Sequence, residues 1–203
     1  MFTGLVQAIG HITEVAPLQG GVRIRIEAPG LAPRAIGLGD SIATRGACLT
    51  VARLEGPYAW SADVSPESLA CTTGLDVPGP VNLETSLALG DVLGGHLVTG
   101  HVDAVGEVAS VEEQGGYRRL RVLVPPALAA LVAAKGSLAI DGVSLTVNTV
   151  EDGPRGAIAS FQVIPHTLQA TTLGTLAAGQ RVNLEADLLA RYLARMLAAR
   201  GGA

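Results

Sequence analysis

Hydrophobic and polar residues alternate along much of the chain with a period of two. Residues 22–26 read VRIRI and residues 120–122 read LRV, so every second side chain in these stretches is apolar. Such alternation is typical of strands that turn one face to a core and the other to solvent. Gly, Pro and Asp-Gly turn signals recur at intervals of about 10 residues, which favours a small closed or nearly closed β-barrel.

The chain also contains one module written twice. Four blocks of the first half match four blocks of the second half in the same order: 2–10 with 98–106, 46–51 with 142–147, 64–73 with 163–172, and 81–84 with 182–185. The first two pairs share one offset (99 − 3 = 96), and small insertions shift the later ones. An internal repeat of this length predicts two copies of one structural unit. We therefore expect an all-β fold of two similar six-stranded Greek-key β-barrels, 1–95 and 96–187, with a junction near 87–95.

Two helices are expected beside the strands. Residues 125–134 of the second copy follow a Pro-Pro start and are rich in Ala and Leu. Residues 188–203 form a second helix, which Asp187 can cap. The apolar positions of this terminal helix fall at i, i+4, i+7 and i+8: Leu189, Leu193, Met196 and Leu197. Its three arginines lie mostly off that stripe: Arg191, Arg195 and Arg200. The stripe either packs on its own barrel or forms a seam between subunits, and the sequence alone leaves both readings open.

The composition of the chain argues against several classes of function. The 203-residue chain has a net charge of −4 and only 3% aromatic residues, which argues against a groove that binds nucleic acid. No stretch approaches the roughly 18 continuous apolar residues of a membrane span, so no membrane partner is expected. The first residues have no basic segment and no small-residue cleavage site, which leads us to expect a cytoplasmic protein. Cys48 and Cys71 fit neither a disulfide framework nor a metal site.

Polar residues concentrate at matching places in the two copies. Cys48 aligns with Ser144, Thr50 with Thr146, and Leu5 with His101. Any one of these groups alone is more simply explained by a structural role. The matched set instead indicates a binding site that differs between the copies, with His101 suited to handling protons near neutral pH. Lys135, the only lysine in the chain, is a weaker hint of a required ammonium group.

Five motifs together carry a family resemblance. The chain begins MFTGLV, and GACLTV, GGHLVTGHVD, IDGVSLTV and VIPHTLQATTLG follow in order. In this order and spacing, from Met1 to about Arg200, the sequence closely resembles riboflavin synthase of the alpha-chain type. That family converts two molecules of 6,7-dimethyl-8-ribityllumazine into riboflavin and 5-amino-6-(D-ribitylamino)uracil, without a cofactor or a metal. Lumazine and fluorescent antenna proteins share the fold and are the non-catalytic alternative.

The resemblance implies substrate-binding residues in two pockets, one for each copy. The first pocket would comprise Phe2, Gly4, Leu5, Val6, Ser41, Cys48, Leu49, Thr50, Asp63, Val64, Ser65, Pro66, Glu67 and Ser68. The second would comprise Gly100, His101, Val102, Lys135, Ser144, Leu145, Thr146, Val163, Ile164, Pro165, His166 and Thr167. Because each barrel is expected to close on itself, each copy should carry its own pocket.

Catalysis by the family needs a nucleophile at C7 of one lumazine and a base for the C7 methyl group of the other. By resemblance, the candidates are Cys48, Ser144 and His101, with Asp187 orienting a partner and with Ser41 and Thr146 donating or accepting hydrogen bonds. Which of them is nucleophile and which is base stays open, as does the barrel that holds the donor.

The resemblance also implies a homotrimer, and it raises association with lumazine synthase, which the sequence leaves open. At one place the chain departs from the family. Arg45-Gly46 stands where the family often has Asn-Gly, while the second copy keeps Asp141-Gly142, so the first turn and its contacts are in question.

Overall fold

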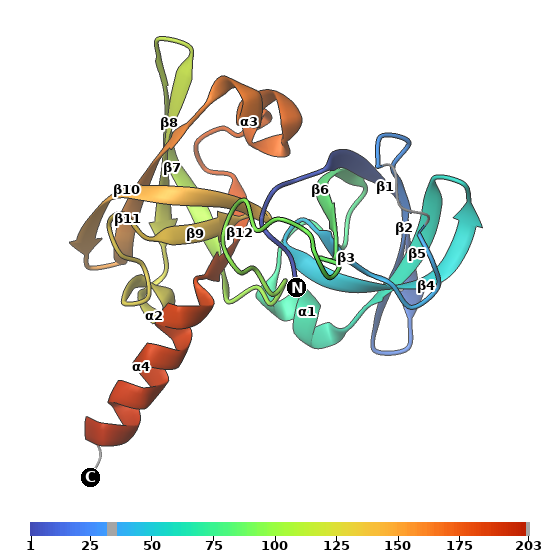
Figure 1. Ribbon diagram of the computed structural model, residues 1–203, viewed down its shortest axis with the longest axis horizontal. Coiled ribbons are helices and arrows are strands. Elements are labelled where there is room, and N and C mark those ends of the chain that lie inside the picture. Colours follow the sequence, from blue (N-terminus) through green and yellow to red (C-terminus); the bar gives the residue numbers. More distant parts are fainter. Residues whose placement is uncertain (32–35, 202–203) are drawn as a thin grey trace.

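The fold of the computed structural model is two β-barrels side by side, with a helix extending from the second (Figure 1). The structure describes residues 1–31 and 36–201. Both barrels are closed, antiparallel and six-stranded, as the period-two pattern and the repeat predict. Residues 202 and 203, the end of the expected terminal helix, lie outside the described residues.

The two barrels have the same strand order. The first runs β1 (Ala8–Leu18), β2 (Gly21–Glu27), β5 (Ala59–Val64), β4 (Ala47–Gly56), β3 (Ser41–Thr44) and β6 (Gly79–Thr85), which pairs with β1 again. The second runs β7 (Ala104–Gln114), β8 (Tyr117–Val124), β11 (Gly156–Val163), β10 (Val143–Gly153), β9 (Ser137–Ile140) and β12 (Arg181–Ala186), which returns to β7. The repeat in the sequence is therefore a repeat of topology.

Each barrel is filled by the inward-facing half of its alternating strands. In β2, Ile24 and Ile26 are fully buried, and Trp60 of β5 fills the same core. Phe161 and Leu120 occupy the corresponding core of the second barrel. Burying an aliphatic side chain of this size stabilises a fold by about 1.5–3 kcal/mol, which is why alternation alone specifies these barrels so well.

The short helices differ from the expectation. Of the predicted helix 125–134, only α2 (Pro126–Ala129) is helical. The chain then continues in turns whose hydrogen bonds join residues i+3 and i, such as the Leu131 N–H and the carbonyl of Leu128. Leu128 and Val132 are buried in the barrel core, so the apolar run reflects packing rather than a helix. Three further short elements gave no sequence signal because they span six residues or fewer: α1 (Pro66–Cys71), α3 (Pro165–Ala170) and the 3₁₀ turn η1 (Thr172–Thr175).

The terminal helix α4 (Leu188–Gly201) begins where it was predicted to begin. The Oδ1 atom of Asp187 accepts from the Leu189 N–H at 2.9 Å, which is the expected cap. The helix then projects away from the second barrel (Figure 1). Its apolar side chains are exposed, with Leu189 at 73% and Leu193 at 58%, so the reading in which the stripe packs on its own barrel is wrong. Within the described part of the chain, no helix is long and apolar enough to cross a membrane.

Candidate active site

The segments that precede the two barrels cross over to each other's barrel. Phe2 and Val98 form an antiparallel bridge, with both backbone hydrogen bonds made (2.7 and 3.1 Å). Beyond the bridge, the carbonyl of Gly4 accepts from the Ser144 N–H, and the carbonyl of Gly100 accepts from the Cys48 N–H, each at 2.8 Å. Cys48 lies on β4 and Ser144 on β10, so the start of each copy lies against the corresponding strand, β10 or β4, of the other copy.

This crossing changes which predicted residues belong together. Val6 packs against the core of the second barrel, and Val102 packs against the core of the first. The sequence-based grouping, with 4–6 beside Cys48 and 100–102 beside Ser144, is therefore wrong. The repeat could not reveal this, because both arrangements satisfy the same alignment. One candidate site combines 4–6 with Ser144, and the other combines 100–102 with Cys48.

A buried carboxylate holds each crossing segment in place. Glu84, on β6, accepts from the N–H and hydroxyl of Thr3 at 2.7 Å and from the Gly4 N–H at 3.0 Å. Glu185, on β12, does the same for Thr99 and Gly100, at 2.6 to 2.9 Å. Burial raises the pKa of both carboxyl groups, while the hydrogen bonds oppose that rise. Each barrel therefore fixes its own leading segment, which then reaches across to its neighbour.

Glycine is required where each segment meets the other barrel. Gly4 has a φ of +74°, and a Cβ placed there would lie 2.6 Å from the Cβ of Ser144. Gly100, with a φ of +77°, would place a Cβ 2.6 Å from that of Cys48. Both the left-handed backbone and the lack of room exclude a side chain. The candidate sites therefore have their main chains packed tightly against Ser144 and Cys48.

Ser144 has a basic partner that the sequence analysis missed. Its Oγ atom lies 2.7 Å from Nδ1 of His96, and the His96 N–H donates to the carbonyl of Thr3 at 3.1 Å. His96 is only 9% exposed, and burial lowers the pKa of its imidazole, although the nearby Asp187 carboxylate opposes that shift. A neutral imidazole beside a hydroxyl can accept its proton. Among the described residues, this dyad is the clearest arrangement for proton transfer.

The Cys48 site is chemically different. The Cys48 side chain is half-buried and packs against a small cluster that contains Phe2 and Val98. His101 lies on the adjoining segment, is exposed, and has its N–H bonded to the hydroxyl of Thr99 at 3.3 Å. Within the described chain, no hydrogen bond joins the Cys48 thiol to a side-chain base. The two sites thus share a backbone frame but differ in their reactive groups.

Strands β4, β5, β10 and β11 place several other predicted residues on two faces. Leu49 and Leu145 point into the barrel cores, as do Val64 and Val163. Thr50 and Thr146 are exposed and alternate with them, so they lie on the outer face with Cys48 and Ser144. Ser41 pairs with Thr50 across β3 and β4. The candidate sites therefore lie on the outside of each barrel rather than in its interior.

The remaining predicted residues lie at the ends of β5, β9 and β11. Asp63 is engaged by Arg23 in a two-point ion pair at 2.6 and 2.8 Å, and this partner lowers the pKa of its carboxyl group. Ser65 caps α1 by accepting from the Ser68 N–H at 3.1 Å. Others occupy α1 or the start of α3 and its approach and are mostly exposed: Pro66, Glu67, Ile164, Pro165, His166 and Thr167. Lys135 is exposed and has a φ of 67°.

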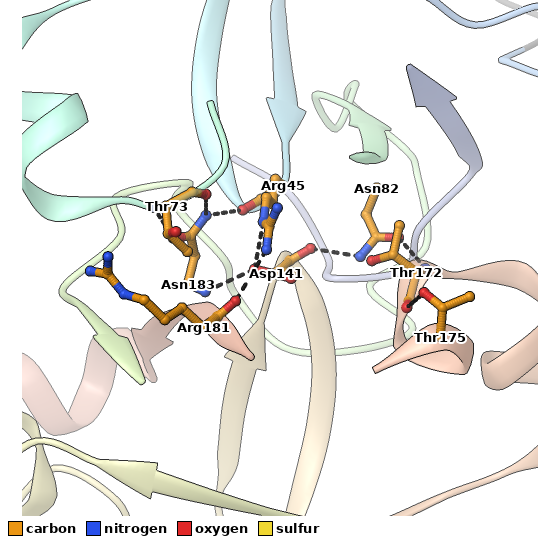
Figure 2. A network of polar contacts seen from close by, with 8 residues as sticks. All are labelled: Arg45, Thr73, Asn82, Asp141, Thr172, Thr175, Arg181 and Asn183. Atoms are coloured by element: carbon orange, nitrogen blue, oxygen red, sulfur yellow. Dashed lines mark hydrogen bonds and ion pairs between the residues drawn. The ribbon is translucent and has the colours of Figure 1, made fainter. Parts of the chain in front are cut away.

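The turn that departs from the family pattern lies at the junction of the barrels. Arg45 and Asp141 both have left-handed backbones, with φ values of 51° and 47°, so the two-residue turn is kept in spite of the arginine. Nε of Arg45 lies 3.2 Å from Oδ1 of the buried Asp141, and its Nη2 donates to the carbonyl of Arg181 at 3.1 Å. Figure 2 shows this pair at the centre of a polar network.

Two asparagines complete that network symmetrically. Asn82 donates to the carbonyl of Asp141 and accepts from the Thr172 N–H, at 2.9 and 2.8 Å. Asn183 donates to the carbonyl of Arg45 and accepts from the Thr73 N–H, at 2.9 and 2.7 Å (Figure 2). Each asparagine therefore ties its own barrel to the other. Together with the crossing segments, these bonds fix the two candidate sites relative to one another.

There are identifiable reasons why the sequence did not lead to His96, Glu84 and Glu185. His96 lies two residues before the matched block that starts at residue 98, so a comparison of the matched blocks could not single it out. Glu84 and Glu185 lie in the repeated Val-Asn-Leu-Glu block. A charged residue at the same place in both copies of a core strand was the available signal. No group of three or more potential metal ligands occurs in the described residues.

The fold and the sites together define a class of protein: duplicated β-barrels with two related but unlike sites. Known proteins belong to the same class. Residues 3–86 and 99–187 each match the lumazine binding domain. The chain is 43% identical to riboflavin synthase of Brucella abortus (strain 2308), covering 97% of this chain and 98% of that one. It is 41% identical to riboflavin synthase of Mycobacterium tuberculosis (strain ATCC 25618 / H37Rv), over 99% and 100%.

A solved structure agrees with this grouping. The structure of LumP complexed with 6,7-dimethyl-8-(1'-D-ribityl) lumazine has a TM-score of 0.79 and 27% identity, over 91% of this chain and 98% of that one. The LumP complex with riboflavin has the same TM-score. The chain belongs to the riboflavin synthase family.

Proposed function

We propose that this protein is a riboflavin synthase. It converts two molecules of 6,7-dimethyl-8-ribityllumazine into riboflavin and 5-amino-6-(D-ribitylamino)uracil, a transferase reaction that is the final step of riboflavin biosynthesis. The observation that carries the proposal is the His96–Ser144 dyad, at 2.7 Å, in a chain 43% identical to a riboflavin synthase. A buried imidazole on a site hydroxyl supplies a base, which catalysis needs and ligand binding alone does not require.

Two unlike sites suit a reaction between two identical molecules. One lumazine must give up a four-carbon unit and the other must accept it, so the sites have to treat them differently. The products together contain all the atoms of the two substrates, and no oxidant, reductant or cofactor is needed. Holding both rings in one orientation supplies much of the rate, because well-oriented intramolecular reactions gain about 7–11 kcal/mol.

We assign the proton transfers by the contacts of each site. His96 accepts the hydroxyl proton of Ser144, whose oxygen then adds to C7 of one lumazine. Cys48 is less suited to that step, since no base contacts its thiol among the described residues. His101, on the segment against Cys48, is the candidate for the C7 methyl proton of the other lumazine. Asp187 acts through His96, whose pKa its charge raises.

The exposed helix supports a proposal for the assembly. We propose that α4 associates in a homotrimer through its stripe, in which Met196 and Leu197 are 57% and 59% exposed. The first barrel of one subunit would then face the second barrel of its neighbour, so that each complete site uses two chains. We also propose a cytoplasmic location. Association with lumazine synthase is tested by co-sedimentation of the two proteins.

The test of function is incubation with the lumazine alone. Riboflavin should appear at one molecule for every two lumazines consumed, without added cofactor. The non-catalytic antenna proteins are the second candidate, because LumP has a similar fold. Tight fluorescent binding of the lumazine with no turnover would establish that candidate instead.

A further inference from the structure

Helix α4 is bonded directly to the segment that lies on Cys48. Nη2 of Arg191, in the first turns of α4, donates to the carboxylate of Asp103 at 2.9 Å and to the carbonyl of His101 at 3.4 Å. The side chains are 34% and 19% exposed, so the contact is partly shielded from water. Asp103 also accepts from the Ala186 N–H at 2.9 Å, just before the helix starts.

The first copy has the same joint without the helix. Gln7 aligns with Asp103 at the offset of 96, and its Oε1 accepts from the N–H and hydroxyl of Thr85 at 3.1 and 3.0 Å. Thr85 aligns with Ala186 at the later offset of 101. Both side chains therefore close the same strand end. Only the second copy has a carboxylate there, and only there does an arginine of α4 bind it.

With the Arg191 contact, the segment that carries His101 is bound at both of its ends. Glu185 holds the front of the segment through Thr99 and Gly100, and Arg191 holds its rear through His101 and Asp103. Gly100 in turn accepts from the Cys48 N–H at 2.8 Å. A displacement of α4 must therefore act on the segment at Cys48. The segment at Ser144 is held by Glu84 and Gln7, with no described bond to α4.

We propose that Arg191 is a positioning residue that couples the terminal helix to the Cys48 site, and that its contacts do not extend to the Ser144 site. This inference rests on the proposed riboflavin synthase activity and deepens it. Association of α4 would fix Arg191, which would then set the backbone at His101. Assembly would thus order the Cys48 site through Arg191.

Two substitutions test the coupling. Asp103→Gln installs the side chain that the first copy uses at this place, which keeps an acceptor for the Ala186 N–H but removes the charge. Arg191→Gln removes the charge from the other side. Each should lower kcat/KM by about tenfold, within the range typical of coupled sites. The fall in kcat/KM of the double variant should be no larger than that of either single variant, because both substitutions remove the same contact. Arg195→Gln, on the same helix but exposed and away from this joint, is the control and should match the unsubstituted protein.

Riboflavin titration followed by fluorescence gives a readout separate from turnover. With one site per barrel, each single variant should weaken one class of site and leave the other unchanged, at an unchanged particle mass. Normal affinity in both classes with full turnover would overturn the proposal, and so would equal weakening of both classes. If the unsubstituted protein binds riboflavin but makes none, the proposed function fails while the titration still decides the role of Arg191.

Discussion

Arg45 and Asp141 join the turns of two hairpins that belong to different barrels. The carboxylate of Asp141 is almost fully enclosed, with 2% of the side chain exposed, and the guanidinium of Arg45 is its only cationic partner among the described residues. Burial raises the pKa of Asp141 and Arg45 opposes that rise. An arginine in a left-handed turn is unfavourable in itself, so the ion pair explains why the chain tolerates it.

Replacing Arg45 with Asn, as the family often has it, tests that explanation. The turn itself should be relieved, but Asp141 loses its cation, and we expect a net loss of about 1–3 kcal/mol of unfolding free energy. The loss should grow as the pH rises through the raised pKa of Asp141, because the protonated carboxyl is easier to leave unpaired than the carboxylate. Denaturant unfolding at pH 5 and pH 8 measures this. Adding Asp141→Asn should restore stability, and a deficit independent of pH would contradict the account.

The pH dependence of catalysis should reflect His96. Because burial holds its pKa below the ordinary histidine value, the neutral imidazole persists into mildly acidic solution. As a base, it is active above its pKa, so kcat should fall as the pH drops through a value below about 6.5. His96→Gln should reduce kcat by about 10²-fold or more and abolish that acidic limb. An acidic limb that persists in His96→Gln would assign the titration to another group.

The close approach at Gly4 can be separated from its backbone strain. Gly4→Ala meets both penalties, whereas Gly179→Ala, at a φ of +84°, adds a Cβ that has nothing within 4 Å. Gly4→Ala should therefore be more destabilising than Gly179→Ala by about 1–3 kcal/mol, the usual cost of overpacking. Thermal or denaturant unfolding compares them. Equal losses would mean that the segment moves away from Ser144 freely.

The exposed stripe of α4 predicts the effect of truncation. A chain ending after Leu188 should be monomeric by light scattering, with both barrels folded by circular dichroism, since each barrel has its own core. Arg195→Gln is the control and should keep the parental mass. A truncated protein that stays a trimer would remove α4 from the interface.

Mixing two inactive proteins tests whether each site uses two chains. A Cys48 variant and a Ser144 variant, each first found to be strongly impaired, are combined under conditions that exchange subunits. In a mixed trimer, an intact first barrel then faces an intact second barrel at some interfaces, and activity should exceed that of either parent. If subunits demonstrably exchange while activity remains parental, both residues belong to a site within one chain.

The sequence predicted the barrels and much less of the way they meet. The alternation of hydrophobic and polar residues, together with the repeat, predicts six strands in each copy, because each strand has one buried face. Neither carries information on which barrel a leading segment covers, so the exchange of 4–6 and 100–102 was invisible. Conversely, Cys48 and Ser144 were found because they differ within an otherwise shared strand. His96 escaped because it lies outside the matched blocks, and α1 and α3 escaped because they are short and bury no residue.

The crossing segments also set the order in which the protein can be finished during synthesis. Gly4 is synthesised well before its partner Ser144, which lies 144 − 4 = 140 residues later. Cys48 likewise waits for Gly100. The first barrel can collapse on its own core as it emerges, since domains fold as units during translation. Its leading segment can already be held by Glu84, but it reaches Ser144 only after most of the second barrel has followed, so the contact that joins Gly4 to the second copy forms late in synthesis.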